Sequence, residues 1–167
     1  IANKFNIKTF IRSEESTQEP VTLQKVFEWY DKLPFKYYII VNACNPLLKI
    51  ETINNFITTF QESESTGLFG VLKQNIFLFG SDNRILPNFY GEEKYLKTFE
   101  TKFVETTYAA SGALYAGKMN DIGNDIYMGT FKQTGDPEFF EMDTLECFDI
   151  DWPRQFETAE ILYKQLM

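Results

Sequence analysis

Histidine is absent from the 167 residues, and cysteine occurs only twice. The absence of histidine excludes Ser-His and Cys-His nucleophilic systems and the usual zinc sites. Cys44 and Cys147 have no zinc-site spacing and cannot form a disulfide framework. We therefore expect two free thiols in a reducing, cytoplasmic environment. Any chemistry must depend on carboxylates, amides, lysine, arginine, tyrosine or a hard metal ion.

Long apolar runs are also missing. No segment approaches the roughly 18 consecutive apolar residues of a membrane span, and no signal peptide is visible. Acidic residues outnumber basic ones by 24 to 16, and the net charge of −8 argues against nucleic acid as a partner. A small anionic substrate is still compatible, because a bound divalent cation can reverse the local field. The length and the hydrophobic share of 44% are those of one soluble globular domain, residues 1–167.

Neither Gly-rich phosphate motif, G-x-G-x-x-G or G-x-x-x-x-G-K-[ST], occurs in the sequence. The chain begins with Ile1, and its first letters, IANKF, are typical of the last turn of a helix already under way. We therefore expect that the natural beginning is missing, together with any loop that would hold a triphosphate.

Strand-like and helix-like segments alternate, which predicts the α/β class with a largely parallel sheet. Strands are expected at 7–11, 35–43, 66–74, 75–80, 111–119 and 126–133, with an extended stretch at 141–151. Helices are expected at 22–30, 53–60 and 153–166, the last with proline at its first position. The segment 75–110 breaks the alternation and predicts a dimerisation arm. Within it Tyr95, Phe99 and Phe103 form one stripe of a helix, either in the core or at a dimer contact.

Two acids, Asp149 and Asp151, are the most suggestive candidates for chemistry. They stand two residues apart in an extended segment, so both carboxylates point to one side. Such a pair suits Mg²⁺ (or Mn²⁺), which takes a few carboxylates and completes its shell with water and phosphate oxygens. Alternatively, Asp151 only favours the dipole of the following helix and Asp149 is solvated.

Other polar residues stand near the ends of expected strands. Asn42 stands near the end of the apolar segment 35–43 and Asn45 follows it, where an open α/β sheet binds ligands, although both are also ordinary turn residues. Gly112 allows either close approach of a ligand to the backbone or a simple turn. Arg12 is either a phosphate contact or a solvated surface residue.

Taken in order, these segments resemble the acylneuraminate cytidylyltransferase family, which makes CMP-sialic acid and related CMP-activated sugars. IIVNACNPLLKIETINNFI is similar to the family's strand, Gln-Pro-Thr-Ser-Pro-Leu-Arg loop and helix. YAASGALY resembles the segment Tyr-x-x-Asn-Gly-Ala-Ile-Tyr, and IANKFNIKTFIRSEES resembles a helix, strand and Arg-Pro-x-x-Leu loop. The most specific match is FDIDWPRQFETAEIL, which resembles the closing Asp-Ile-Asp segment and its helix. The likeness spans essentially the whole chain.

The resemblance implies a Rossmann-like nucleotide-diphospho-sugar transferase fold and a homodimer that exchanges an arm. It implies transfer of CMP from CTP to a sialic-acid-like sugar acid, with release of pyrophosphate. Asp149 and Asp151 fall on the family's metal-binding acids and are the catalytic candidates. The resemblance also implies that Arg12 contacts the nucleotide. It implies a set of residues that contact the sugar substrate: Asn42, Asn45, Lys49, Tyr108, Ser111 and Gly112.

Several positions depart from the family's pattern. Asn42 occupies the position of a glutamine, Ser111 that of an asparagine and Trp152 that of a small residue. Leu48 occupies the position of an arginine, and the neighbouring Lys49 is the candidate substitute cation. The family's N-terminal CTP loop has no counterpart, so we expect that this chain alone neither binds CTP nor turns it over. The alternatives are a non-catalytic homologue that serves as a binding or assembly module, and a nucleotidyltransferase for another sugar acid of the 3-deoxy-octulosonate type.

Overall fold

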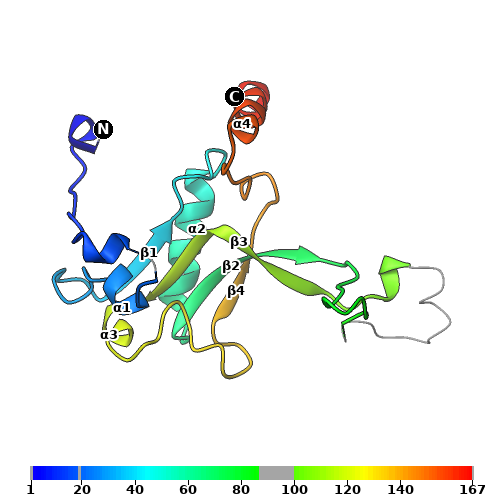
Figure 1. The fold of residues 1–167 in the computed structure, drawn as a ribbon, viewed down its shortest axis with the longest axis horizontal. Helices are drawn as coiled ribbons and strands as arrows, with labels where there is room; N and C mark the ends of the chain where they lie inside the picture. The colour runs from blue at the N-terminus through cyan, green and yellow to red at the C-terminus, as the bar shows by residue number, and fades with distance from the viewer. Residues whose placement is uncertain (1, 19, 87–99, 167) are drawn as a thin grey trace.

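The computed structural model describes residues 2–18, 20–86 and 100–166. Within these ranges the chain forms a four-stranded sheet, α-helices and short 3-10 helices (Figure 1). The strands are β1 (Tyr37–Val41), β2 (Gly67–Gln74), β3 (Thr107–Lys118) and β4 (Glu138–Glu141). The α-helices are α1 (Leu23–Val26), α2 (Ile50–Glu62), α3 (Met119–Ile122) and α4 (Pro153–Leu166). The 3-10 helices are η1 (Ala2–Phe5), η2 (Glu15–Thr17) and η4 (Thr101–Phe103).

The order of strands across the sheet is β1-β3-β2-β4. β3 pairs antiparallel with both β1 and β2, whereas β2 and β4 are parallel. The α/β class is therefore confirmed, but the sheet is mixed. β1, β2 and β4 run in one direction and β3 runs against them, so the expectation of a largely parallel sheet is wrong for most bonded pairs. An apolar run shows that a strand is covered on both faces, but it does not fix the direction of its neighbours.

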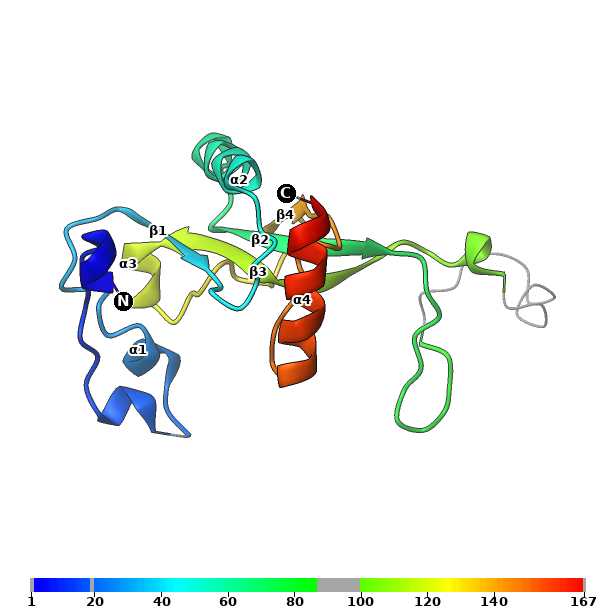
Figure 2. The same cartoon turned by 90° about the horizontal axis from the view of Figure 1, so that it is seen from above.

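Apolar clusters cover the two faces of the sheet. On one face α2 buries Phe56 and Phe60 against Leu68 of β2 and Leu114 of β3. The cluster on the other face comes from α1, β1, α3 and the loop after α3, and its buried members are Phe27, Tyr38, Met119, Ile122 and Tyr127. Figure 2 shows α1 and α2 on opposite sides of the strands. β1 contributes to both clusters, with Ile39 on the α2 side and Tyr38 on the other side.

Two expected strands are not strands of the sheet in the described part of the chain. Residues 7–11 are extended but unpaired, and Ile11 is 90% exposed. Residues 75–80 contribute only an isolated bridge between Phe79 and Ile85. A β-branched or aromatic run has strand character by itself, but a strand needs the free edge of a neighbour.

Local backbone conformation explains two other differences. The segment 126–133 is a loop, because Met128 and Phe131 have φ angles of 59° and 55°, in the left-handed region that interrupts a strand. Of the extended stretch 141–151, only the first residue lies in β4, and turns follow. The helix expected at 22–30 is regular only in α1 and continues as turns. The strands expected at 35–43, 66–74 and 111–119 and the helices at 53–60 and 153–166 are confirmed.

Beyond the helices, β2 and β3 continue as a two-stranded ribbon that projects from the body (Figure 1). Asn75 ties its two chains together by donating to the Val104 carbonyl at 3.2 Å. Two members of the expected aromatic stripe, Tyr95 and Phe99, lie outside the described residues, and Phe103 lies in η4. The ribbon ends where the segment 75–110 begins, and the dimerisation arm expected there stays a prediction. Among the described residues, no helix is long and apolar enough to cross a membrane.

Candidate functional site

The candidate site begins where β1 ends. Asn42 continues the ladder, because its backbone N–H donates to the Ala113 carbonyl at 2.9 Å. Its side chain donates to the Gly112 carbonyl at 2.9 Å and accepts the Cys44 N–H at 3.0 Å. Asn42 was expected to contact a substrate, but these bonds use its amide to fasten the loop to β3.

Asn45 and Asp149 are the unexplained polar groups of this region. Asn45 is 5% exposed, and neither its Oδ1 nor its Nδ2 has a hydrogen-bond partner in the described part of the chain. Asp149 Oδ1 is likewise buried and unpaired within that part. The loops that carry them are joined, since the Ile150 N–H donates to the Cys44 carbonyl at 3.0 Å. Buried polar groups are almost always paired, so this arrangement calls for a water, an ion or a ligand.

Gly112 brings the backbone of β3 up to Asp149. Its φ of +74° lies in the left-handed region, and a Cβ at this position would stand 3.9 Å from Asp149 Oδ2. A residue with a side chain would be strained here. Gly112 therefore allows β3 to bend and allows the Asp149 carboxylate to approach the backbone of that strand.

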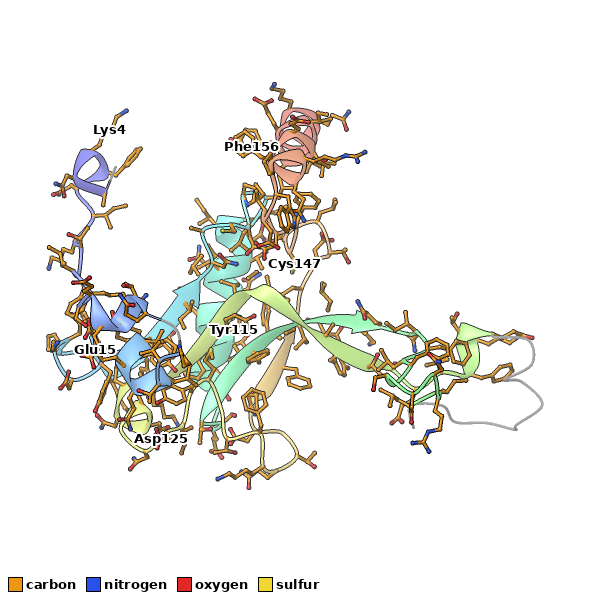
Figure 3. The ribbon with its side chains drawn as sticks, viewed as in Figure 1. Lys4, Glu15, Tyr115, Asp125, Cys147 and Phe156 are labelled. Carbon is orange, nitrogen blue, oxygen red and sulfur yellow. The ribbon has the colours of Figure 1, made fainter. Side chains whose placement is uncertain are left out.

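Ser111 and Cys147 lie beneath the site, within the α2 side of the core. Ser111 is 5% exposed, and its Oγ accepts the Ala113 N–H at 3.2 Å. Burial raises the pKa of the Cys147 thiol to about 11, and a hydrogen bond with Ser111 partly opposes that rise. The Ser111 hydroxyl is thus engaged inside the protein. Figure 3 shows Cys147 on the segment that leads from β4 to α4.

Lys49, the expected substitute for the family's arginine, forms an ion pair. Its Nζ lies 3.1 Å from Glu146 Oε1, and its backbone N–H donates to Glu146 Oε2 at 3.2 Å. The hydrogen bond and charge of Glu146, which is 4% exposed, raise the pKa of Lys49. Glu146 was missed because its partner is 97 positions away in the sequence, too distant for any local spacing to indicate.

Asp151 stands at the entry to α4 with an exposed side chain. Gln155 Oε1 caps this helix by accepting the N–H groups of Asp151 and Trp152, both at 2.8 Å. No lysine or arginine in the described part of the chain pairs with Asp149 or Asp151, and no group of three or more acidic or cysteine side chains gathers there. A pair of carboxylates is still a fitting set for Mg²⁺, which usually keeps several waters and uses phosphate oxygens.

The structure brings Tyr115 to the site, although sequence reasoning did not single it out. Burial raises the pKa of its phenol, a hydrogen bond from the Gly112 backbone opposes the rise, and the Asp149 charge adds to it. Its ring also packs against Phe69, with 4.5 Å between centroids. The signal available in the sequence was its position three residues after Gly112, on the strand that carries the glycine.

Tyr108 and Arg12 make contacts elsewhere. The Tyr108 hydroxyl is 3.3 Å from Glu141 Oε1, a carboxylate that also pairs with Lys73 at 3.4 Å. Arg12 Nε donates to Ser16 Oγ at 3.1 Å, within the loop that leads to η2. No contact among the described residues links either side chain to the loop 42–49 or to Asp149.

At the level of sequence, the chain matches no protein-family profile and no curated protein. Its fold is similar to that of 4-diphosphocytidyl-2C-methyl-D-erythritol synthase from Anaerococcus prevotii, with a TM-score of 0.54 and 11% identity. The match covers 86% of this chain and 67% of the other chain. This likeness shows the fold, an α/β architecture with a mixed sheet.

Proposed function

We propose that this chain is the acceptor- and metal-binding portion of a cytidylyltransferase that transfers CMP from CTP to a sialic-acid-like sugar acid. The observation that carries the proposal is the buried Asn45 amide, which follows β1, together with Asp149 Oδ1 on the adjoining loop, since none of these atoms has a hydrogen-bond partner in the described part of the chain. Support also comes from the fold, which is shared with an enzyme named for a diphosphocytidyl product. Unsatisfied polar groups are costly in a folded core, and they persist at functional sites where a ligand completes them.

The reaction assigned to the site is a nucleotidyl transfer. The oxygen of the acceptor hydroxyl forms a bond to the α-phosphorus of CTP, the bond from that phosphorus to pyrophosphate breaks, and the hydroxyl proton passes to solvent water. Such a transfer requires positioning and neutralisation of charge more than covalent assistance. Mg²⁺ held by Asp149 and Asp151 would neutralise the phosphates and lower the pKa of the attacking hydroxyl.

The remaining residues position the acceptor. The Asn45 amide offers one acceptor and two donor hydrogens to hydroxyl groups of a sugar. Gly112 leaves space for close approach beside Asp149, and the Tyr115 phenol lies along the same side. Because Glu146 balances the charge of Lys49, the pair Lys49–Glu146 would hold the N-terminal end of α2 rather than supply an unpaired cation.

A binding or assembly module is the second candidate. It is favoured by the engagement of Asn42, Lys49 and Ser111 in contacts within the protein. The two candidates differ at Asp149, which a module would not need and an enzyme could not lose.

Asp149→Asn tests the proposal. We expect Mn²⁺ affinity, followed by electron paramagnetic resonance on residues 1–167 with pyrophosphate present, to fall at least about tenfold, because a metal-held charge is removed. In the natural polypeptide that contains these residues, pyrophosphate release with CTP, Mg²⁺ and sugar acids should fall on the order of 10³-fold. Glu157→Gln removes an exposed acid of α4 and is the matched control.

Equal rates and equal Mn²⁺ affinities for Asp149→Asn and the control would show that the acid is only part of the entry to α4. The module would then be the better description. Release with 3-deoxy-octulosonate but not with a sialic acid would instead revise the acceptor and retain the reaction.

A further inference from the structure

Two contacts fasten the loop between β1 and α2 to the segment that leads from β4 to α4. At one end the Ile150 N–H donates to the Cys44 carbonyl at 3.0 Å. At the other end Glu146 Oε2 accepts the Lys49 N–H at 3.2 Å, and Glu146 Oε1 lies 3.1 Å from Lys49 Nζ. The two segments therefore run in opposite directions, side by side, between these contacts (Figure 1).

The unpaired polar groups of the candidate site adjoin the first contact. Asn45 directly follows Cys44 in the sequence, and Asp149 directly precedes Ile150. The Asn45 amide and Asp149 Oδ1 have no hydrogen-bond partner in the described part of the chain. The contacts between the two segments, rather than bonds made by these atoms, therefore determine where the atoms lie.

Apolar packing holds the middle of both segments against the core. Cys147 is a buried member of the cluster on the α2 side, and Leu48 packs against that cluster. Apolar contacts are not directional, so they resist separation of the segments more than they resist sliding of one along the other. The register of the two segments therefore depends on the polar contacts at their ends.

Glu146 is more deeply buried than the support of a helix end requires. Its side chain is 6% exposed, whereas the side chain of Lys49 is 65% exposed. The carboxylate loses hydration on burial, so an ion pair of this kind adds little net stability. An acid in the first turn of α2, such as the exposed Glu51, favours the helix dipole without that cost. The buried pair is therefore better suited to fixing the register of two segments.

We propose that Glu146 is a positioning residue of the candidate site: by holding Lys49, it fixes the segment that carries Asp149 against the loop that carries Asn45. This inference rests on the proposed function, in which Asp149 holds the metal and Asn45 contacts the acceptor. Loss of the contact would leave each of these groups in the chain but would let the two segments shift. Only part of the molecules would then have the register that binds metal, and the apparent affinity would fall by that fraction.

Glu146→Gln tests the proposal, with Glu51→Gln as the matched control. Both remove an acidic charge near the start of α2, but only the first removes the ion pair with Lys49. Electron paramagnetic resonance on residues 1–167, with pyrophosphate present, measures the Mn²⁺ affinity at a temperature where all variants are folded. We expect the affinity to fall about threefold or more for Glu146→Gln and to equal that of the wild type for Glu51→Gln.

Glu146→Asp separates position from charge. It keeps the carboxylate but shortens the side chain by one methylene, so the two oxygens can no longer reach both the N–H and Nζ of Lys49 as they do in the wild type. If the position of the segment matters, the Mn²⁺ affinity should fall for Glu146→Asp as well, again about threefold or more. A fall for Glu146→Gln alone would mean that only the charge of Glu146 acts on the metal, and it would overturn the positioning role.

Hydrogen exchange followed by nuclear magnetic resonance gives a readout that does not depend on metal. The reference is the Met142 amide, which donates to the Val71 carbonyl at 2.9 Å and lies outside the two segments. Relative to this reference, the Ile150 amide should exchange about threefold faster or more in both Glu146 variants, because its contact with the loop opens more often. Glu51→Gln should leave the ratio of the two exchange rates unchanged.

The outcomes distinguish this proposal from the proposed function. Mn²⁺ affinities of the Glu146 variants equal to that of Glu51→Gln, or an unchanged exchange ratio at Ile150, would overturn the positioning role, and Glu146 would then only cap α2. Asp149→Asn would still weaken Mn²⁺ binding in that case. Equal Mn²⁺ affinities for the wild type and Asp149→Asn would instead overturn the proposed function, and with it the role of Glu146 in metal binding, even if exchange at Ile150 rose.

Discussion

A single buried carboxylate, Asp136, fixes the loop before β4. It is 4% exposed and accepts hydrogen bonds from the hydroxyls of Ser65 and Thr66, both at 2.6 Å, and from the N–H of Thr130 at 3.1 Å. Burial works against the charged form, but these donors outweigh it and hold the pKa of Asp136 well below its usual range. The residue therefore contributes to stability as an anion.

Asp136→Asn should lower the free energy of unfolding by about 2 kcal/mol at neutral pH, since an amide cannot accept from all of these donors. Because the folded pKa is lowered, the contribution is present above the unfolded value of 3.8 and is lost as pH falls below it. Urea denaturation at pH 7 and near pH 3 measures both effects. Asp31→Asn, an exposed acid, should change stability by less than about 0.5 kcal/mol. A difference that grows on acidification would contradict this account.

At the scale of one element, α2 depends on an acid from another part of the chain. Lys49 precedes the helix and supplies no side-chain cap, while the Glu146 carboxylate accepts its N–H at 3.2 Å. A negative group at a helix N-terminus is favoured by the exposed N–H groups and by the helix dipole. Glu146 thus connects the start of α2 to the loop that carries Asp149.

Glu146→Gln should destabilise the protein by about 1 kcal/mol, because the charge at the start of α2 is lost while an acceptor oxygen is kept. Thermal melting measures the change. Glu141→Gln is the control, since Glu141 is exposed and pairs only with surface groups. An unchanged melting temperature for Glu146→Gln would show that the contact does not support the helix.

The sequence predicted elements well where the pattern was local. The spacing of Ile53, Ile57 and Phe60 predicted α2, and the apolar run before Asn42 predicted β1. The segments 7–11 and 126–133 have strand-like composition, but pairing and left-handed φ angles decided their structure. Strand propensity describes how well a residue fits a half-buried sheet surface. It does not provide the neighbouring strand with which a segment must form hydrogen bonds.

In the candidate site, too, local sequence patterns predicted some features, while contacts between distant segments were not predicted. The spacing of Asp149 and Asp151 predicted two acids on one side of an extended segment, whereas the approach of Asp149 to Gly112 joins two distant segments and was not predicted. The pairing of Lys49 with Glu146 depends on a contact between distant segments, which no local pattern contains. The burial of Asn45 follows from the packing of the whole loop.

At the scale of the whole molecule, the two apolar clusters are separate but share the central sheet. Phe56→Leu acts on the α2 side and Ile122→Val on the other, and each should cost about 1 kcal/mol. Because the two positions share no contact, the double variant should equal the sum within about 0.5 kcal/mol. Urea denaturation should show one transition with an unchanged m-value. Two transitions would mean that the sheet does not join its two faces into one cooperative unit.

The contrast between the two thiols has a practical consequence. Cys44 is exposed, whereas Cys147 is buried and burial raises the pKa of its thiol to about 11, so Cys147 stays in the unreactive thiol form at pH 7. A maleimide dye therefore attaches to Cys44 without any engineered substitution. The carbonyl of that residue holds the Ile150 N–H, so the dye reports from the junction between the loop of Asn45 and the loop of Asp149. The native chain carries its own attachment point for spectroscopy of the candidate site.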